Sequence, residues 1–326
     1  MELINKQKTL YIGCTKLSNN IILAPMSGIT DAPLRYLAKR NGAGLVYTEM
    51  ISAKAIIHRN EKTKKIIKIY LQEKPIAVQI FGCDVYSMSE AAKIIADTGA
   101  DIIDINLGCP AKKITKIGAG ARLLDNKKLI FKILESVVKS VNIPITIKIR
   151  TGLIPNKNLA PQVIDIAQNC GIKMVVVHAR PASQGNKGIP DLKSFADACK
   201  NAQIPIIANG GITNEQTAYD FLKIPNCSGI MIGQGAIANY SIFKRLENFF
   251  YMKKESTLPL KTERIQWFKE HIQRSIAHYG EKQGLIKIRK IACYYLKGLP
   301  NASKAQTIFN KTVTLIDAME LINNII

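Results

Sequence analysis

Short runs of β-branched and other apolar residues recur along the first three quarters of the chain, and each ends in small or polar residues. Eight such runs predict strands: Ile21–Ala24, Leu45–Thr48, Ile76–Ile80, Ile102–Ile105, Ile145–Ile149, Met174–Val177, Pro205–Ala208 and Gly229–Ile232. Longer stretches with helical spacing lie between them: Ser87–Thr98, Asn126–Val141, Pro161–Asn169 and Thr213–Leu222. Alternating buried strands and helices are typical of parallel βαβ units, and eight units predict a closed (β/α)8, or TIM, barrel. A doubly wound open sheet fits less well, because no Gly-x-Gly-x-x-Gly follows the first strand.

From about Lys244 the pattern becomes wholly helical. The segment Arg264–Tyr279 places its apolar residues on one face, and Thr312–Ile325 predicts a final helix. Between them, Lys287–Lys297 has an apolar side (Ile288, Ile291, Ala292, Tyr295) and a basic one (Lys287, Lys290, Tyr294, Lys297), and Gly298-Leu299-Pro300 ends it. We therefore expect a barrel domain over residues 1–243 and a small all-helical domain over residues 244–326.

The charge balance indicates a polyanionic partner. The chain has 46 Lys and Arg against 24 Asp and Glu, a formal net charge of +22. An Ile-, Lys- and Asn-rich composition could raise the charge everywhere, but the grouping of lysines on one helix face favours binding of a polyanion such as a nucleic acid. The seven cysteines are irregularly spaced, which predicts neither a disulfide framework nor a metal site. Neither a membrane-spanning run nor a signal-peptide core at Met1–Lys8 is evident, so we expect a cytoplasmic protein without a membrane partner.

The residues at the predicted strand ends form a chemically coherent set, and a TIM barrel has its functional groups at these ends. They are the turn Ala24–Asp31, Gln79, Asn106 with Cys109, Lys148 with Arg150, His178 with Arg180, Asn209-Gly210-Gly211 and Gly233-Gln234-Gly235. Cys109 precedes a proline, which holds the thiol in a loop, and Lys112 and Lys113 follow it. A buried structural cysteine, a barrel-lining Lys148 and a structural His178 are the alternatives.

Two glycine-rich turns follow the seventh and eighth predicted strands. Loops at these positions commonly bind a phosphate through backbone N–H groups. One glycine pair alone would be weak evidence, because turns need glycine anyway. Both turns together predict a phosphorylated cofactor.

At this point the sequence resembles the tRNA-dihydrouridine synthases, most closely the B-type bacterial subfamily. The matching segments occur in the family's order across nearly the whole barrel: Ala24–Asp31, Val78–Gly82, Ile103–Pro110 with Gly120-Ala121, Lys148–Gly152 and Ile207–Ile212. The Asn106-Leu107-Gly108-Cys109-Pro110 block is highly specific. The basic helical C-terminus also resembles the tRNA-binding domain of that family.

The resemblance implies an enzyme that uses bound FMN, and NADPH or possibly NADH as reductant, to reduce the C5–C6 double bond of uridines in tRNA. It implies hydride transfer from reduced FMN to C6 and a proton from Cys109 to C5. The implied cofactor residues are Pro25, Met26, Ser27, Gln79, Lys148, His178, Asn209, Gly210, Gly211, Gly233 and Gln234. The expected substrate and tRNA contacts are Asn106, Lys112, Lys113, Arg150, Arg180, Lys287, Arg289, Lys290, Tyr294 and Lys297. We expect a monomer without a metal.

Three positions depart from the family pattern. Gln234 stands where an arginine is usual, Gly211 stands where many relatives have aspartate, and the loop Ala179–Gly185 deviates from the usual Arg-Thr continuation. Two other functions therefore stay open. One is an FMN-dependent reductase of a free pyrimidine or other small molecule, which would leave the basic helices unexplained. The other is a non-catalytic RNA-binding relative that has lost its cofactor.

Overall fold

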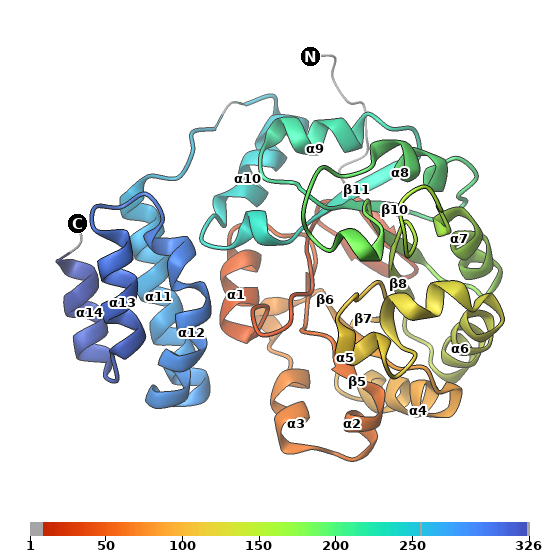
Figure 1. Ribbon diagram of the computed structural model, residues 1–326, viewed down its shortest axis with the longest axis horizontal. Coiled ribbons are helices and arrows are strands. Elements are labelled where there is room, and N and C mark those ends of the chain that lie inside the picture. Colours follow the sequence, from red (N-terminus) through yellow and green to blue (C-terminus); the bar gives the residue numbers. More distant parts are fainter. Residues whose placement is uncertain (1–8, 255, 325–326) are drawn as a thin grey trace.

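The computed structural model describes residues 9–254 and 256–324, and its larger part is a barrel of parallel strands surrounded by helices (Figure 1). The expectation for Met1–Lys8 and the end of the last predicted helix lie outside these residues. The barrel strands are β3 (Ile21–Leu23), β4 (Val46–Tyr47), β6 (Ile76–Phe81), β7 (Ile102–Leu107), β8 (Ile145–Arg150), β9 (Met174–His178), β10 (Ile206–Asn209) and β11 (Cys227–Ile232). Their spatial order is β3-β11-β10-β9-β8-β7-β6-β4, and a parallel bridge between Ile22 and Leu45 closes the ring. The predicted TIM barrel is confirmed.

The helices cover the outside of the barrel or extend from its loops. They are α1 (Ala32–Arg40), α2 (Ala53–Ile57), α3 (Glu61–Ile67), α4 (Val85–Ala96), α5 (Lys112–Thr115), α6 (Lys127–Ser140), α7 (Ala160–Asn169), α8 (Leu192–Cys199), α9 (Glu215–Leu222) and α10 (Ser241–Glu247). A short strand, β5 (Ile51–Ser52), extends the pairing of β4 along β6. Several helices begin at a side-chain cap that satisfies a free N–H group, as Asp84 does for Ser87 at 2.7 Å.

Alternation along each strand separates the outer core from the barrel interior. In β7, Ile103, Ile105 and Leu107 pack against the helices, whereas Ile102 belongs to the inner cluster. Asp104 and Asn106 share the parity of Ile102 and therefore face the interior. The same alternation directs the polar residues of the other strands into the barrel. The interior near the carboxyl ends of the strands is therefore lined by polar side chains.

A hairpin that the sequence did not predict closes the amino-terminal end of the barrel. Strands β1 (Leu10–Ile12) and β2 (Thr15–Leu17) pair antiparallel, and Leu10, Ile12 and Leu17 join the inner cluster of strand residues. The turn at Gly13 lies against Pro144, just before β8. The hairpin thereby covers with apolar side chains the end of the barrel opposite the strand-end loops.

The C-terminal part is an array of four helices beside the barrel (Figure 1). They are α11 (Lys261–Tyr279), α12 (Glu281–Leu296), α13 (Ala302–Lys311), which the sequence did not predict, and α14 (Leu315–Asn323). The last of these begins after Thr314, whose hydroxyl accepts the N–H of Asp317 at 3.1 Å. The boundary expected at residue 243 falls inside α10, which contacts β3 and α9 and buries Phe243 and Leu246. Among the described residues, no helix is long and apolar enough to cross a membrane.

Candidate active site

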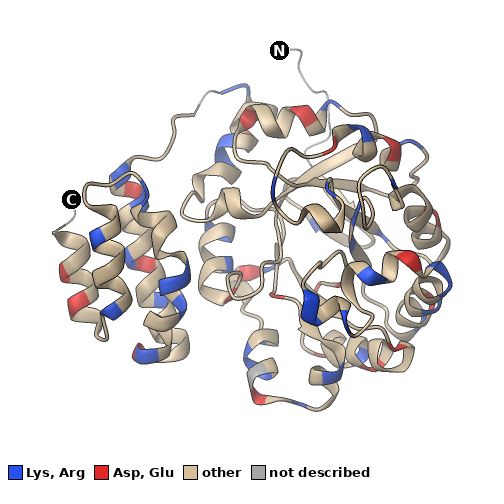
Figure 2. Ribbon diagram, in the orientation of Figure 1, with Lys and Arg blue, Asp and Glu red and all other residues tan. Residues whose placement is uncertain are grey.

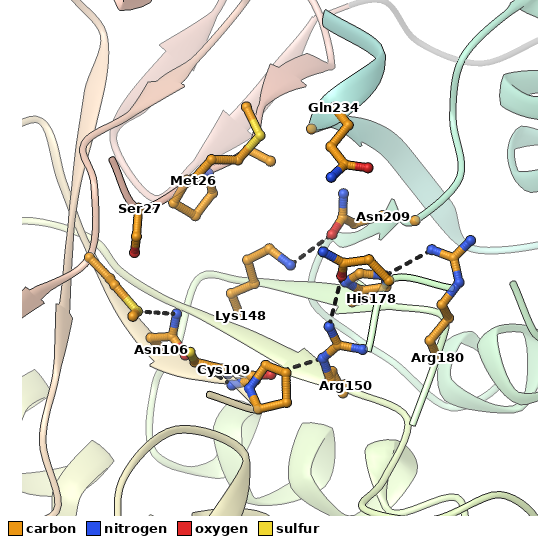
Figure 3. Close-up of a pocket in the computed structure, with 18 of the residues that line it drawn as sticks. Met26, Ser27, Asn106, Cys109, Lys148, Arg150, His178, Arg180, Asn209 and Gln234 are labelled. Carbon is orange, nitrogen blue, oxygen red and sulfur yellow. Dashed lines mark hydrogen bonds between the residues drawn. The ribbon is translucent and has the colours of Figure 1, made fainter. Parts of the chain in front are cut away.

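A pocket of about 390 Å³ opens at the carboxyl ends of the barrel strands (Figure 3). Its volume falls within the range of small-molecule and cofactor sites. Every residue that the resemblance assigned to a cofactor lines it: Pro25, Met26, Ser27, Gln79, Lys148, His178, Asn209, Gly210, Gly211, Gly233 and Gln234. Asn106, Cys109, Arg150 and Arg180 line it as well. The pocket therefore brings together groups from seven strands or the loops that follow them.

Strand register explains why these side chains meet. Asn106 lies opposite Lys148 in the β7–β8 pair, Arg150 lies opposite His178 in the β8–β9 pair, and His178 lies opposite Asn209 in the β9–β10 pair. Neighbouring parallel strands place such partners at the same height and on the same face. Inward-facing residues at two successive levels, Asn106 with Lys148 and Arg150 with His178 and Asn209, thus supply most of the polar groups of the pocket.

A buried hydrogen-bond chain leads from Asp104 to the cysteine loop. The Asp104 carboxylate accepts Thr146 Oγ1–H at 2.6 Å and Gln79 Nε2–H at 2.7 Å. Gln79 Oε1 accepts Asn106 Nδ2–H at 2.9 Å, and Asn106 Oδ1 accepts the N–H of Cys109 at 2.9 Å. Since a carboxylate can only accept, each amide in the chain has one favoured orientation. Asp104 therefore fixes the backbone at Cys109 through two side chains.

Further contacts hold the Cys109 loop in place. Arg150 Nε donates to Gly108 O at 2.9 Å, and the N–H of Ala121 donates to Cys109 O at 3.0 Å. The Cys109 side chain is half-buried and borders the pocket beside Asn106, away from Gln234 and Asn209 (Figure 3). This arrangement presents a thiol in a set position to a ligand in the pocket.

Lys148 and Asp104 are ionisable groups inside the barrel, and burial shifts the pKa of each. Burial raises the pKa of Asp104 to about 6, although its hydrogen bonds with Thr146 and Gln79 oppose the rise. Burial and the nearby charge of Arg150 lower the pKa of Lys148 to about 7. Lys148 Nζ donates to Asn209 Oδ1 at 2.8 Å, which aims the amine at the middle of the pocket (Figure 3). A lysine with such a pKa changes its charge easily when a negative group approaches.

The remaining charged side chains form the side of the pocket near the β9 loop. Arg150 Nη1 donates to Gly185 O at 2.7 Å, and its Nη2 donates to Asn186 Oδ1 at 3.1 Å. Burial and the charges of Lys148, Arg150 and Arg180 hold the pKa of His178 far below its usual range, so this imidazole is neutral. Arg180 Nη1 lies 3.2 Å from His178 Nε2 and can only donate, so Nε2 accepts and Nδ1 carries the proton.

The glycine loops after β10 and β11 form the opposite end of the pocket from Cys109. In the described part of the chain, the N–H groups of Gly210, Gly211, Gln234 and Gly235 have no hydrogen-bond partner. Convergent backbone N–H groups of this kind bind phosphate groups. A cavity with such N–H groups at one end and polar side chains along its length fits a flavin mononucleotide.

Of the ten residues expected to contact the substrate or the tRNA, Asn106, Arg150 and Arg180 line the pocket, and the other seven lie outside it. Lys112 and Lys113 are exposed on α5, directly after the cysteine loop, whereas Lys287, Lys290 and Tyr294 of α12 and Lys297 just after it are exposed or half-buried. Lysine and arginine positions, coloured blue, occur on both helices in Figure 2. Lys290 Nζ reaches the loop after β3, within 3.1 Å of the position that a Cβ atom on Gly28 would take. Arg289 instead donates to Thr312 O at 2.9 Å, which joins α12 to the end of α13.

Among the residues of this site that sequence reasoning missed are Asp104 and Met50. Asp104 was not selected, although a single carboxylate inside the apolar run Ile102–Ile105 was the available signal. Met50 also lines the pocket, and its sulfur lies 3.6 Å from Asn106 Nδ2; nothing in the sequence marks it. Within the described residues, no cluster of three His, Cys, Asp or Glu side chains could hold a metal ion.

The sequence is similar to known proteins over almost its whole length. A family model described as Dihydrouridine synthase (Dus) matches residues 22–325. A tRNA-dihydrouridine synthase B of Pasteurella multocida is 39% identical over 295 residues, which cover 90% of this chain and 88% of that protein. A probable tRNA-dihydrouridine synthase of Rickettsia bellii is 38% identical over 296 residues, covering 90% and 91%.

Two solved structures support the fold. Histamine dehydrogenase from Rhizobium aligns with a TM-score of 0.58 at 10% identity, covering 74% of this chain and 48% of that one, so this chain spans about half of its length. A variant of NCR from Zymomonas mobilis aligns with a TM-score of 0.54 at 15% identity, covering 81% and 96%. The family match, the curated relatives and the pocket agree: the chain belongs to the dihydrouridine synthase family and is a flavin-dependent oxidoreductase.

Proposed function

We propose that this protein reduces the C5–C6 double bond of specific uridines in tRNA, with FMN as the bound cofactor and NADPH as the reductant. The observation that carries the proposal is the Cys109 loop, held by Asn106 and Arg150 at one side of a pocket whose far end presents unpaired backbone N–H groups in the described part of the chain. Membership of the family and the relatives named for tRNA support the substrate.

The residues that would hold FMN come from both ends of the pocket. Gly210, Gly211 and the loop at Gly233-Gln234 would bind its phosphate, and Gln79 and Lys148 would contact its ring system. FMN, when bound, supplies the hydride that is added to C6 of the uracil. Lys148 is placed to stabilise negative charge near the ring, since its pKa of about 7 lets it take up a proton there.

Cys109 serves as the general acid in this proposal. Its thiol borders the pocket opposite Asn209 and Gln234, so a base lying between them would present C5 to the sulfur. The thiol donates its proton to C5 when hydride reaches C6, and the two atoms are added to opposite faces of the base. Asn106 keeps the sulfur in position by accepting the N–H of Cys109.

The basic residues of α5 and α12 would contact the RNA. A uridine must turn out of its stack to enter a pocket of this depth, and contacts to the surrounding backbone help to offset that cost. Lys112 and Lys113 on one side and Lys287, Lys290 and Lys297 on the other are available for such contacts. We place the protein in the cytoplasm and propose that it acts as a monomer.

An absorbance titration tests the function directly. The purified protein should show flavin bands that NADPH bleaches and that return, without oxygen, only when tRNA lacking dihydrouridine is added. Equal recovery with free uridine would favour a small-molecule reductase. A protein that stays colourless and inert after addition of FMN would favour a non-catalytic RNA-binding protein.

Cys109→Ala tests the proton donor. The variant should bind flavin and be reduced by NADPH like the wild type, while dihydrouridine formation falls by about 10²–10⁴-fold, as is typical for loss of a general acid. Cys83→Ala is the matched control, because Cys83 also packs at the edge of this loop but does not line the pocket. Undiminished tRNA reduction by Cys109→Ala would refute the acid role.

A further inference from the structure

The phosphate end of the pocket needs a positive charge that its loops do not provide. The N–H groups at Gly210, Gly211, Gln234 and Gly235 carry partial charges only, and Gln234 itself is neutral. A phosphate monoester with close to two negative charges is held best by charge-assisted hydrogen bonds as well. The source of that charge must therefore lie on a neighbouring strand or loop.

Three cationic side chains line the pocket, and two of them are engaged elsewhere. Lys148 is directed to Asn209 in the middle of the pocket. Arg150 donates to Gly108 O, Gly185 O, Pro181 O and Asn186 Oδ1, so both edges of its guanidinium are used by the protein. His178 adds no charge, because burial keeps it neutral. Arg180 is the third cation, and the protein holds it by fewer contacts, one at Nη1 and one at Nη2.

The guanidinium of Arg180 lies against the glycine loop after β10. Its Nη1 is 3.3 Å from the position of a Cβ atom on Gly210, and its Nη2 is 3.2 Å from that on Gly211. The residue is only 5% exposed, and its Nε has no hydrogen-bond partner among the described residues. That nitrogen is itself enclosed, so the donors available to a ligand are the second N–H groups of Nη1 and Nη2, the two atoms that lie nearest the glycine loop.

We propose that Arg180 binds the phosphate of the flavin and supplies the charge that Gln234 lacks, a role distinct from the RNA contact expected for it from the sequence. The planar guanidinium suits a phosphate better than any other side chain, since it offers two parallel N–H groups. The contact of Nη2 with Gly188 O at 2.8 Å holds the group in place beside the loop. This inference rests on the proposed function only in requiring that FMN binds in the pocket.

The test compares FMN with riboflavin, which has the same ring system but no phosphate. Full-length protein freed of flavin is titrated with each, and binding is followed by the change in flavin fluorescence. We expect the wild type to prefer FMN strongly. Arg180→Gln should weaken FMN binding by about 10- to 100-fold, the loss typical of a charge-assisted contact, and leave riboflavin binding unchanged.

Two further variants make the result specific. Lys187→Gln removes the same charge from an exposed position of the same loop and should change neither affinity. Arg180→Gln combined with Gln234→Arg should restore the preference for FMN, because the second substitution returns a cation to the same phosphate site.

Three results would overturn the inference. An unchanged preference for FMN in Arg180→Gln, with weaker tRNA binding, would return Arg180 to the RNA. An equal loss of FMN and riboflavin affinity would show that Arg180 only supports the loop. A wild type that binds neither flavin would refute the proposed function itself, whereas the first two results would leave that function standing.

Discussion

At the scale of single residues, the site depends on polar groups placed inside a barrel that is otherwise apolar. Asp104 is fully buried, and its neighbours in β7 are apolar. Its ionisation is assisted by hydrogen bonds from Thr146 and Gln79 and by the charge of Lys148. The barrel accepts these groups because each has a partner; an unpaired charge at this depth would cost several kcal/mol.

The pH dependence of stability should reveal the burial of Lys148. Its pKa is about 7 in the folded protein, whereas the unfolded chain keeps the proton up to its ordinary value of about 10.5. Between these values the unfolded state binds more protons, so the folded state gains stability as the pH rises. We expect the melting temperature of flavin-free wild type to rise, relative to Lys148→Met, from pH 7.5 to 10. A constant difference, measured by circular dichroism, would contradict the shifted pKa.

The site residues that lie at the ends of strands could be predicted from the sequence. Once the end of each strand was located, its position in chain order and the family resemblance indicated Gln79, Asn106, Lys148, His178 and Asn209. The pairing between them could not be predicted, because register, and so the contact of Lys148 with Asn209, is set only when the barrel closes. Asp104 lies within the apolar run Ile102–Ile105 rather than after it, and it was missed although it lies opposite Gln79 in the β6–β7 pair.

At the scale of elements, the predictions succeeded where burial makes a long apolar signal. The strands of a parallel barrel are buried on both faces, so runs such as Ile145–Ile149 stand out. The hairpin β1–β2 escaped prediction because each strand has only three residues and Tyr11 and Lys16 interrupt the pattern. Its place in the fold depends on contacts with residues far along the chain, which no local window contains.

The close approach of α11 and α12 at Gly284 predicts how a substitution there changes the stability of the protein. A Cβ atom on Gly284 would lie 2.7 Å from backbone atoms of Ser275 and Ile276, so the two helices approach as closely as glycine allows. Alanine favours helix by roughly 1 kcal/mol, but overpacking of a close contact costs about 1–3 kcal/mol. We expect Gly284→Ala to lower the melting temperature, whereas Gln283→Ala, at an exposed position of the same helix, should not. A stabilised Gly284→Ala would show that the helices can separate.

At the scale of the whole molecule, the helical array is attached to the barrel beside the pocket. Tyr295 of α12 shares hydrogen bonds with His271 at 2.8 Å and with Tyr240 of the barrel at 2.7 Å, all of them buried. Arg40 of α1 forms an ion pair with Glu270 of α11 at 2.7 Å. Buried polar contacts across a junction favour one orientation over others, so α12 has a defined position relative to the active-site loops.

That position makes Lys290 the residue that connects the two parts of the proposed RNA surface. Its ammonium group reaches the loop of Gly28, next to Ser27 at the pocket, while its helix belongs to the C-terminal array. A phosphate beside a uridine in the pocket would therefore meet this lysine. Lys290→Gln should weaken tRNA binding and lower the slope of log affinity against log salt concentration by about one, as expected for one lost phosphate contact.

Lys304→Gln on the outer helix α13 is the control, since it removes the same charge from the same domain at a greater distance from the barrel (Figure 1). It should change neither the affinity nor the salt slope, and both variants should keep flavin reduction by NADPH. Equal effects of the two substitutions would mean that tRNA responds to the overall charge of the domain. A larger effect at Lys290 would place the RNA backbone in the junction between α12 and the barrel, where a turned-out uridine can reach Cys109.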